Sequence, residues 1–171
     1  MQCFFPSLIF RIAVIAVALT IFIPALTALD TREPAPGFTA MTLDGEKLTN
    51  SLLKGKVVLL QFWTTWCPYC RRDEDAVEAI TKEFAKQDLL VVAVNVGESR
   101  RKVKQYLQQS PRSCKVVITE DTNLAAIFAA KSFPMYVLID RQGKIAGTQN
   151  GAGGEDMLRR LLSKAEIEPQ Q

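Results

Sequence analysis

The sequence contains no histidine, so the side chain that most often activates a catalytic cysteine or completes a zinc site is missing. The excess of positive over negative charge is also small: 21 lysines and arginines are nearly balanced by 18 aspartates and glutamates, which gives a net charge of +3. These charges are spread along the chain and form no basic patch of the kind that nucleic-acid binding requires. We therefore expect neither DNA nor RNA as a partner.

A long uncharged run stands near the start of the chain. Residues 12–29 are apolar except for Thr20, Pro24 and Thr27. This length fits a short membrane-spanning helix, and it also fits the apolar part of a secretory signal with a weak cleavage site in PALTALD (24–30). We predict that residues 1–29 are a signal peptide or a transmembrane anchor, in preference to a buried core helix.

The rest of the chain, after this predicted signal peptide or anchor (the leader), falls into three parts. Residues 30–36 (DTREPAP) combine charge with two prolines and are expected to form a linker, residues 37–165 a single domain, and residues 166–171 a tail. Either form of the leader would place this domain in the periplasm or on the outer face of the cytoplasmic membrane, anchored or secreted. Disulfides persist there, whereas cytosolic reductants keep thiols reduced.

The domain alternates strand patterns with helix patterns. Residues 37–50 alternate apolar and polar positions around Asp44 and Gly45, which predicts a hairpin, and residues 55–63 and 88–96 are continuous apolar runs typical of buried strands. A helix is expected over 68–86 and another after Ser99, which can cap it. The remaining segments predict strands at 114–119, 135–140 and 144–149, a short helix at 123–130 and a closing helix around 157–162. This order predicts an α/β fold with a central mixed sheet flanked by helices.

The cysteines carry the clearest chemical signal. Cys3 precedes the apolar run, so the exported part would hold Cys67, Cys70 and Cys114, an odd number that disfavours a framework of structural disulfides. A zinc site would need these three thiolates and a carboxylate, and a structural disulfide across so short a loop would add little stability. A redox-active dithiol is the favoured interpretation, and no metal or other cofactor is expected.

The position of Cys67 supports redox chemistry. It directly follows a buried strand and precedes Pro68, which is well suited to the first position of a helix. A thiol at the cap faces unpaired backbone N–H groups and the positive end of the helix dipole, and both favour the thiolate that attacks disulfides. Cys70, one turn further on, is placed to resolve the mixed disulfide.

Three segments together resemble a known family. FWTTWCPYC (62–70) after an aliphatic strand, APGFTAMTLDG (35–45) before it and FPMYVLID (133–140) after it are similar to the membrane-tethered TlpA/ResA-like thioredoxins, which are grouped with the thiol-specific antioxidant and redoxin proteins. The resemblance covers about residues 34 to 165. It implies a thioredoxin fold with an added N-terminal β-hairpin.

The resemblance also implies roles for individual residues. Cys67 would be the exposed nucleophile and Cys70 the buried resolving thiol, and Pro134 would be held in cis beside them. The substrate-binding residues are then expected to be Trp66, Pro68, Tyr69, Phe133 and Pro134.

Several positions depart from the family pattern. Gln61 stands where relatives often carry a buried acid or asparagine, so proton transfer to Cys70 would need water or another carboxylate. Asp75 replaces a proline that kinks the helix in relatives, so a straighter helix is expected, and Phe133 is larger than usual.

Arg71, Arg72 and Cys114 are expected to have structural roles rather than roles in the redox chemistry. Arg71 and Arg72 are expected on a solvated face together with the acidic residues 73–75, rather than as groups that tune the thiols. Cys114 is expected to be a small buried hydrophobic residue rather than a third redox partner.

The resulting prediction is an extracytoplasmic thiol–disulfide oxidoreductase, expected to be a monomer. It would reduce disulfides in exported clients such as apocytochrome c and be recharged by a membrane electron donor of the CcdA/DsbD kind. The alternatives are a disulfide-forming oxidant, a thiol peroxidase of the peroxiredoxin type and a thioredoxin-like copper carrier. The peroxidase lacks its usual proline, since Leu60 stands there, and the copper carrier lacks its usual histidine.

Overall fold

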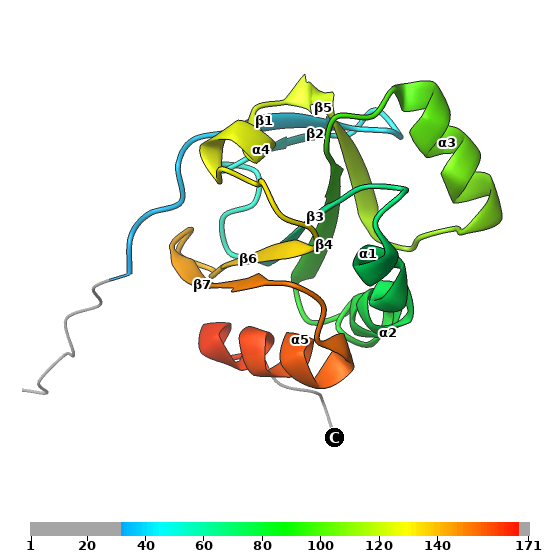
Figure 1. Ribbon diagram of the computed structural model, residues 1–171. Coiled ribbons are helices and arrows are strands. Elements are labelled where there is room, and N and C mark those ends of the chain that lie inside the picture. Colours follow the sequence, from blue (N-terminus) through cyan, green and yellow to red (C-terminus); the bar gives the residue numbers. More distant parts are fainter. Residues whose placement is uncertain (1–31, 168–171) are drawn as a thin grey trace, which may run out of the picture. The chain divides into compact units, whose positions relative to one another are not determined.

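A seven-stranded sheet forms the centre of the protein, in the order β2-β1-β5-β4-β3-β6-β7 (Figure 1). The computed structural model describes residues 32–167, so the predicted leader, 1–29, lies outside the described residues. The strands are Thr39–Thr42 (β1), Lys47–Thr49 (β2), Val57–Trp63 (β3), Leu89–Asn95 (β4), Lys115–Thr122 (β5), Met135–Ile139 (β6) and Ile145–Asn150 (β7). The helices are Pro68–Arg72 (α1), Glu74–Glu83 (α2), Arg100–Gln109 (α3), Leu124–Ile127 (α4) and Gly154–Leu162 (α5), followed by the 3-10 turn Ser163–Ala165 (η1).

The sheet is mixed, as the sequence predicted. Strand β3 runs parallel to β4 and antiparallel to β6, and β4 runs parallel to β5. All seven residues of β3 are buried, which explains its nearly continuous apolar sequence. Strands β1 and β2 pair antiparallel through a turn at Asp44 and Gly45, and β1 also pairs with β5, so both strands extend the same sheet.

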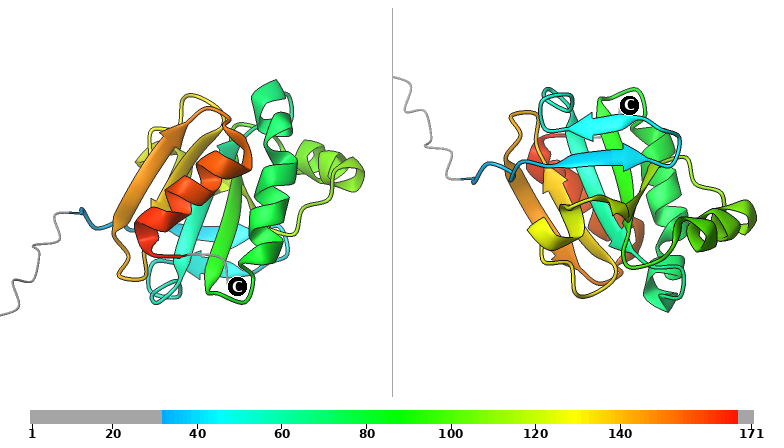
Figure 2. Two further views of the ribbon diagram at one scale, coloured as in Figure 1. Left: turned by 90° about the horizontal axis from the view of Figure 1, so that it is seen from below. Right: turned by 90° about the horizontal axis from the view of Figure 1, so that it is seen from above.

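Successive side chains of β3 point to opposite faces of the sheet and feed two separate cores. Leu59 and Trp63 pack with Ile80 of α2 and Leu158 of α5. The alternate residues of β3 pack on the other face, with the β1–β2 pair and α4. Helices α2 and α5 lie side by side over the first face, while α3 stands at the flank (Figure 2).

One predicted helix is interrupted. The sequence predicted a single, straighter helix over 68–86, and this was wrong: α1 ends at Arg72 and α2 begins at Glu74. Asp73 separates them with φ −91° and ψ 0°, and it is only 1% exposed. The break occurs because the Asp73 side chain turns into the protein, where it accepts hydrogen bonds from distant parts of the chain.

Residues 32–36, assigned above to a linker, contact the turn that follows β6. Arg32 forms an ion pair with buried Asp140 at 2.9 Å, and the Ala35 N–H donates to the Gly143 carbonyl at 2.9 Å. At the other end, Ile167 is 3% exposed within the α2–α5 core. Within residues 32–167, no helix combines the length and the apolar character needed to cross a bilayer.

Candidate active site

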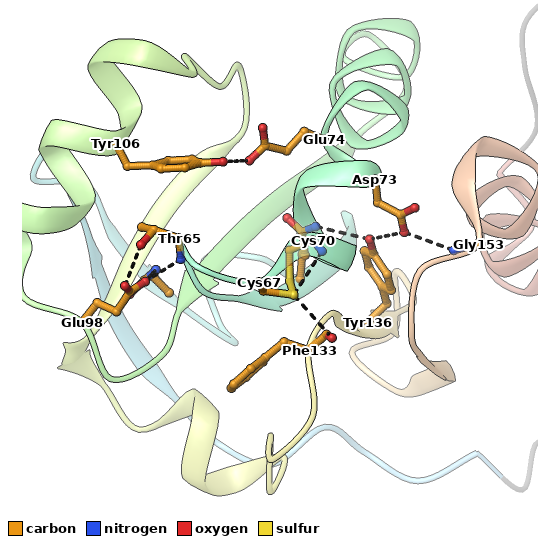
Figure 3. Close-up of a disulfide and its surroundings, with 12 residues drawn as sticks. Thr65, Cys67, Cys70, Asp73, Glu74, Glu98, Tyr106, Phe133, Tyr136 and Gly153 are labelled. Atoms are coloured by element: carbon orange, nitrogen blue, oxygen red, sulfur yellow. Dashed lines mark hydrogen bonds between the residues drawn. A yellow bond between two sulfur atoms is a disulfide. The ribbon is translucent and has the colours of Figure 1, made fainter.

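The site is built where β3 leaves the sheet and α1 begins. Cys67 is the N-cap of α1, with φ −76° and ψ 112°, and its Sγ accepts a hydrogen bond from the Cys70 N–H at 3.1 Å (Figure 3). Pro68 occupies the first turn, as predicted, where its missing N–H costs no hydrogen bond. Cys67 and Cys70 form a disulfide with a Cα–Cα distance of 5.3 Å.

Both cysteines are buried in this disulfide-bonded form. Cys70 is fully buried, as predicted, but Cys67 is 3% exposed, so the expectation of an exposed sulfur was wrong for this state. The reason is that the Cys67 Sγ lies 3.5 Å from the Phe133 carbonyl oxygen, on the segment that precedes β6. The fold thus covers the sulfur with a loop that lies 66 positions away in sequence.

The predicted substrate-binding residues lie on two segments, 66–69 and 133–134, that come together at this covered sulfur. Trp66 and Tyr69 are 60% and 56% exposed, which is unusual for large aromatic side chains. The Trp66 ring meets the Phe133 ring edge-on with centroids 6.3 Å apart. The Phe133–Pro134 peptide bond is cis, as the family resemblance implied, and Pro134 is buried while Pro68 is exposed.

Asp73 is a buried acid that the sequence did not reveal. Its Oδ2 accepts hydrogen bonds from the Tyr136 hydroxyl at 2.9 Å and the Gly153 N–H at 3.2 Å, and its Oδ1 accepts one from the Gly154 N–H at 3.0 Å. The expectation that Asp73 lies on a solvated face was therefore wrong. Burial raises the pKa of Tyr136, and the neighbouring Asp73 carboxylate raises it further, so the hydroxyl stays a donor.

A second polar group lies behind Tyr136. The Gln61 amide donates to the Tyr136 hydroxyl at 3.3 Å and accepts from Arg112 at 2.9 Å. Arg112 in turn pairs with Glu74 at 2.6 Å and stacks 3.9 Å from the centre of the Trp63 ring. A continuous chain of polar contacts thus runs through the interior from Asp73 to Glu74. No pattern in the sequence connects Gln61 with these partners.

Cys114 takes no part in this arrangement. It is a free thiol, 8% exposed, just before β5, and its burial raises its pKa. This agrees with the small buried hydrophobic residue expected from the sequence. No group of three or more acidic or cysteine side chains placed to bind a metal ion occurs in the described part of the chain.

Comparison with known proteins agrees with this geometry. The redoxin family model matches residues 30–162, which include the cysteine pair and every strand of the sheet. This chain belongs to the redoxin family. Together with the Cys67–Cys70 disulfide at the start of α1, membership identifies it as a thiol–disulfide oxidoreductase.

Individual redoxin relatives point the same way. The chain is 31% identical over 129 residues to the thiol-disulfide oxidoreductase ResA of Bacillus subtilis, covering 75% of this chain and 72% of that protein. It is 29% identical over 130 residues to ResA of Halalkalibacterium halodurans, covering 76% and 74%. Among solved structures, a thiol:disulfide interchange protein of the thioredoxin family from Chlorobium tepidum TLS superposes with a TM-score of 0.71 at 27% identity, covering 81% of this chain and 99% of that chain.

Proposed function

We propose that this oxidoreductase works outside the cytoplasm as a reductant of disulfides in exported proteins. The observation that supports it best is the pairing of a capped sulfur, Cys67, with a fully buried partner, Cys70, next to a rim of exposed aromatic rings. Such a site would present Cys67 to a client once the Phe133 segment moves aside, and it keeps Cys70 for the resolving step. The apolar run at residues 12–29 supports the extracytoplasmic location.

The proposed reaction begins with both cysteines reduced. The Cys67 thiolate attacks one sulfur of a client disulfide, which forms a mixed disulfide and releases the other client sulfur as a thiolate. Cys70 loses its proton and attacks the Cys67 sulfur, so the client leaves as a dithiol and the enzyme keeps the disulfide. Two electrons have then passed from the enzyme to the client. The N–H of Cys70, which donates to the Cys67 Sγ, favours the Cys67 thiolate that makes the first attack.

The residues around the cysteine pair would hold the client during this exchange. Trp66 and Tyr69 offer exposed rings that bury apolar surface on binding, and Pro68 completes the same turn. The Phe133 backbone, beside the cis bond to Pro134, would pair with an extended client strand. In this proposal Phe133 must give way locally, since its carbonyl covers the Cys67 sulfur in the disulfide form.

We further propose apocytochrome c as a client and a membrane dithiol protein of the CcdA/DsbD kind as the electron source. An apocytochrome presents a Cys-x-x-Cys-His segment whose cysteines must be reduced before haem attachment. The membrane donor would return two electrons to the Cys67–Cys70 disulfide after each turnover, and no bound cofactor is required.

The reduction potential of the cysteine pair tests the direction of the reaction. The full-length protein in detergent would be equilibrated with mixtures of reduced and oxidised dithiothreitol, and the fraction of disulfide measured by thiol alkylation. A value near that of thioredoxin, about −270 mV, supports the reductant, while one near that of the oxidant DsbA, about −120 mV, reverses the assignment.

The client is tested separately by trapping. A Cys70→Ser variant cannot resolve the mixed disulfide, so it should accumulate a covalent adduct with an oxidised Cys-x-x-Cys-His peptide. A Cys67→Ser variant is the matched control and should form none. Equal trapping of a peptide whose disulfide lacks the haem-binding sequence would argue against a preference for apocytochromes.

A further inference from the structure

Glu98 is a buried acid with a direct connection to the active-site loop. It lies in the short segment between β4 and α3, and its side chain is 4% exposed. One oxygen accepts the Thr65 N–H at 2.6 Å and the Asn95 amide at 2.8 Å, and the other accepts the Thr65 hydroxyl at 2.7 Å and pairs with Lys102 at 2.6 Å. All four donors converge on one carboxylate, and Figure 3 shows the two bonds from Thr65.

Thr65 is the middle residue of loop 64–66, which joins β3 to Cys67. The loop carries Trp66, whose ring is 60% exposed and so gains little anchorage from the core. Within the loop, the Cys67 N–H donates to the Thr64 carbonyl at 3.3 Å, a local bond that cannot fix the loop relative to the sheet. The two bonds from Thr65 to Glu98 provide that anchorage, 33 positions away in sequence.

As a carboxylate, Glu98 accepts at both oxygens and can take all four donors at once. A protonated acid would have to donate one hydrogen and could not accept from all four partners. Burial by itself disfavours the charge, but the bonds from Asn95, Lys102 and Thr65 outweigh it and lower the pKa to about 2. The hydrogen bonds and the ion pair of Glu98 go to Thr65, Asn95 and Lys102 and not to Cys67, so its contribution to the site acts through Thr65.

We propose that Glu98 is a positioning residue for thiol–disulfide exchange: it holds loop 64–66 so that Cys67 and the Trp66 ring stand correctly for an incoming disulfide. The inference rests on the oxidoreductase activity and not on the identity or location of the client. Nucleophilic attack on sulfur is sensitive to alignment, and a displacement of about 1 Å can lower a rate by about a hundredfold. A loop held by two fewer bonds would leave the Cys67 thiolate less often in the attacking position.

Two substitutions of Glu98 separate hydrogen bonding from charge. In Glu98→Gln the amide oxygen can still accept from Thr65 and Asn95, and the amide nitrogen can donate to the Thr65 hydroxyl, so the anchor survives without its charge. In Glu98→Ala all four contacts are lost. Glu46→Ala is the matched control, since it removes an exposed carboxylate that pairs with Lys115 and not with loop 64–66.

The test measures the rate at which each reduced full-length protein in detergent attacks 5,5′-dithiobis(2-nitrobenzoate), a small disulfide that needs no client docking. We expect Glu98→Ala to react at least about tenfold more slowly, with Glu98→Gln and Glu46→Ala within about threefold of the parent. Unfolding in urea is followed in parallel, because a purely structural role would lower stability and leave the rate of the folded protein unchanged. An unchanged rate for folded Glu98→Ala, or an equal loss in Glu98→Gln, would overturn the proposal.

Thr65→Val provides a second route if Glu98→Ala does not fold. Valine keeps the shape of threonine and the N–H bond to Glu98, but it removes the hydroxyl bond. A rate several-fold below the parent supports the anchor, and a parental rate contradicts it. The reduction potential of the cysteine pair, measured on the same variants, should move less than the rate, because the loop contact is to Thr65 and not to either sulfur.

Discussion

At the scale of single residues, Asp73 shows how an acid can shape a redox site without lying at its surface. Its three hydrogen bonds join the end of α1 to Tyr136 on β6 and to the start of α5. Burying a carboxyl group is costly unless each oxygen finds partners, and here both do. The residue therefore ties together three elements that meet beside Cys70.

Asp73→Asn should lower the free energy of unfolding by roughly 1–3 kcal/mol, because an amide nitrogen in place of Oδ2 leaves the Gly153 N–H without an acceptor. Asp75→Asn is the matched control: it is exposed in the first turn of α2 and should cost less than about 1 kcal/mol. Urea unfolding of the disulfide form measures both. Equal losses would contradict the role assigned to Asp73.

Glu98 should make stability depend on acid pH. Its folded pKa of about 2 lies below its ordinary value of 4.5, so its contribution is complete above 4.5 and disappears as the pH falls toward 2. The difference in unfolding free energy between the parent and Glu98→Gln should shrink over this window. A difference that stays constant from neutral pH to pH 2 would show that the charge does not contribute.

At the scale of elements, the active site depends on a helix that is interrupted after one turn. The apolar spacing of Val77 and Ile80 correctly predicted the helix that packs on the sheet, but not its late start at Glu74. Helical periodicity reports only which residues face the core. The break is produced by partners at positions 136, 153 and 154, which no local pattern in α1 or α2 reveals.

The first turn of α5 leaves no room for a side chain at its N-cap residue, Gly153. A Cβ at position 153 would lie 2.7 Å from the Met157 Cβ, so Gly153→Ala should displace the first turn of α5 and cost about 1–3 kcal/mol in urea unfolding. Gly37→Ala is the control, since nothing lies within 4 Å of its Cβ. Similar stabilities for the two variants would show that α5 can shift freely.

At the scale of the whole molecule, two apolar clusters on opposite faces of one sheet support a site at the end of β3. Leu158 of α5 is fully buried in the same cluster as both active-site cysteines, so core packing and the position of the disulfide are coupled. The redox pair is thus part of the core rather than an addition to its surface.

Leu158→Ala should lower the free energy of unfolding by about 2–5 kcal/mol, because it leaves a cavity between α5 and the sheet. Leu52→Ala removes the same atoms from a side chain that is 61% exposed and should change stability by less than about 0.5 kcal/mol. Thermal or urea unfolding distinguishes them. A small effect of Leu158→Ala would mean that α5 closes the gap.

Much of the fold could be predicted from local patterns. The continuous apolar runs predicted β3 and β4, and Ser99 caps α3 through the Lys102 N–H as expected. The cap position of Cys67 could also be predicted from the sequence, because proline is favoured in the first turn of a helix and Pro68 follows Cys67 directly. The cis bond before Pro134 followed only from the family resemblance, since the residues themselves give it no strong preference.

The sequence by itself determined the chemistry: two thiols one helical turn apart, with the first at a helix start, are sufficient for disulfide exchange without histidine. The tertiary structure decided the surroundings of those thiols. It covered Cys67 with the Phe133 carbonyl, buried Asp73 and tied Thr65 to Glu98. The physical reason is range, because capping and periodicity act over a few residues, whereas each of these contacts joins segments that only the folded sheet brings together.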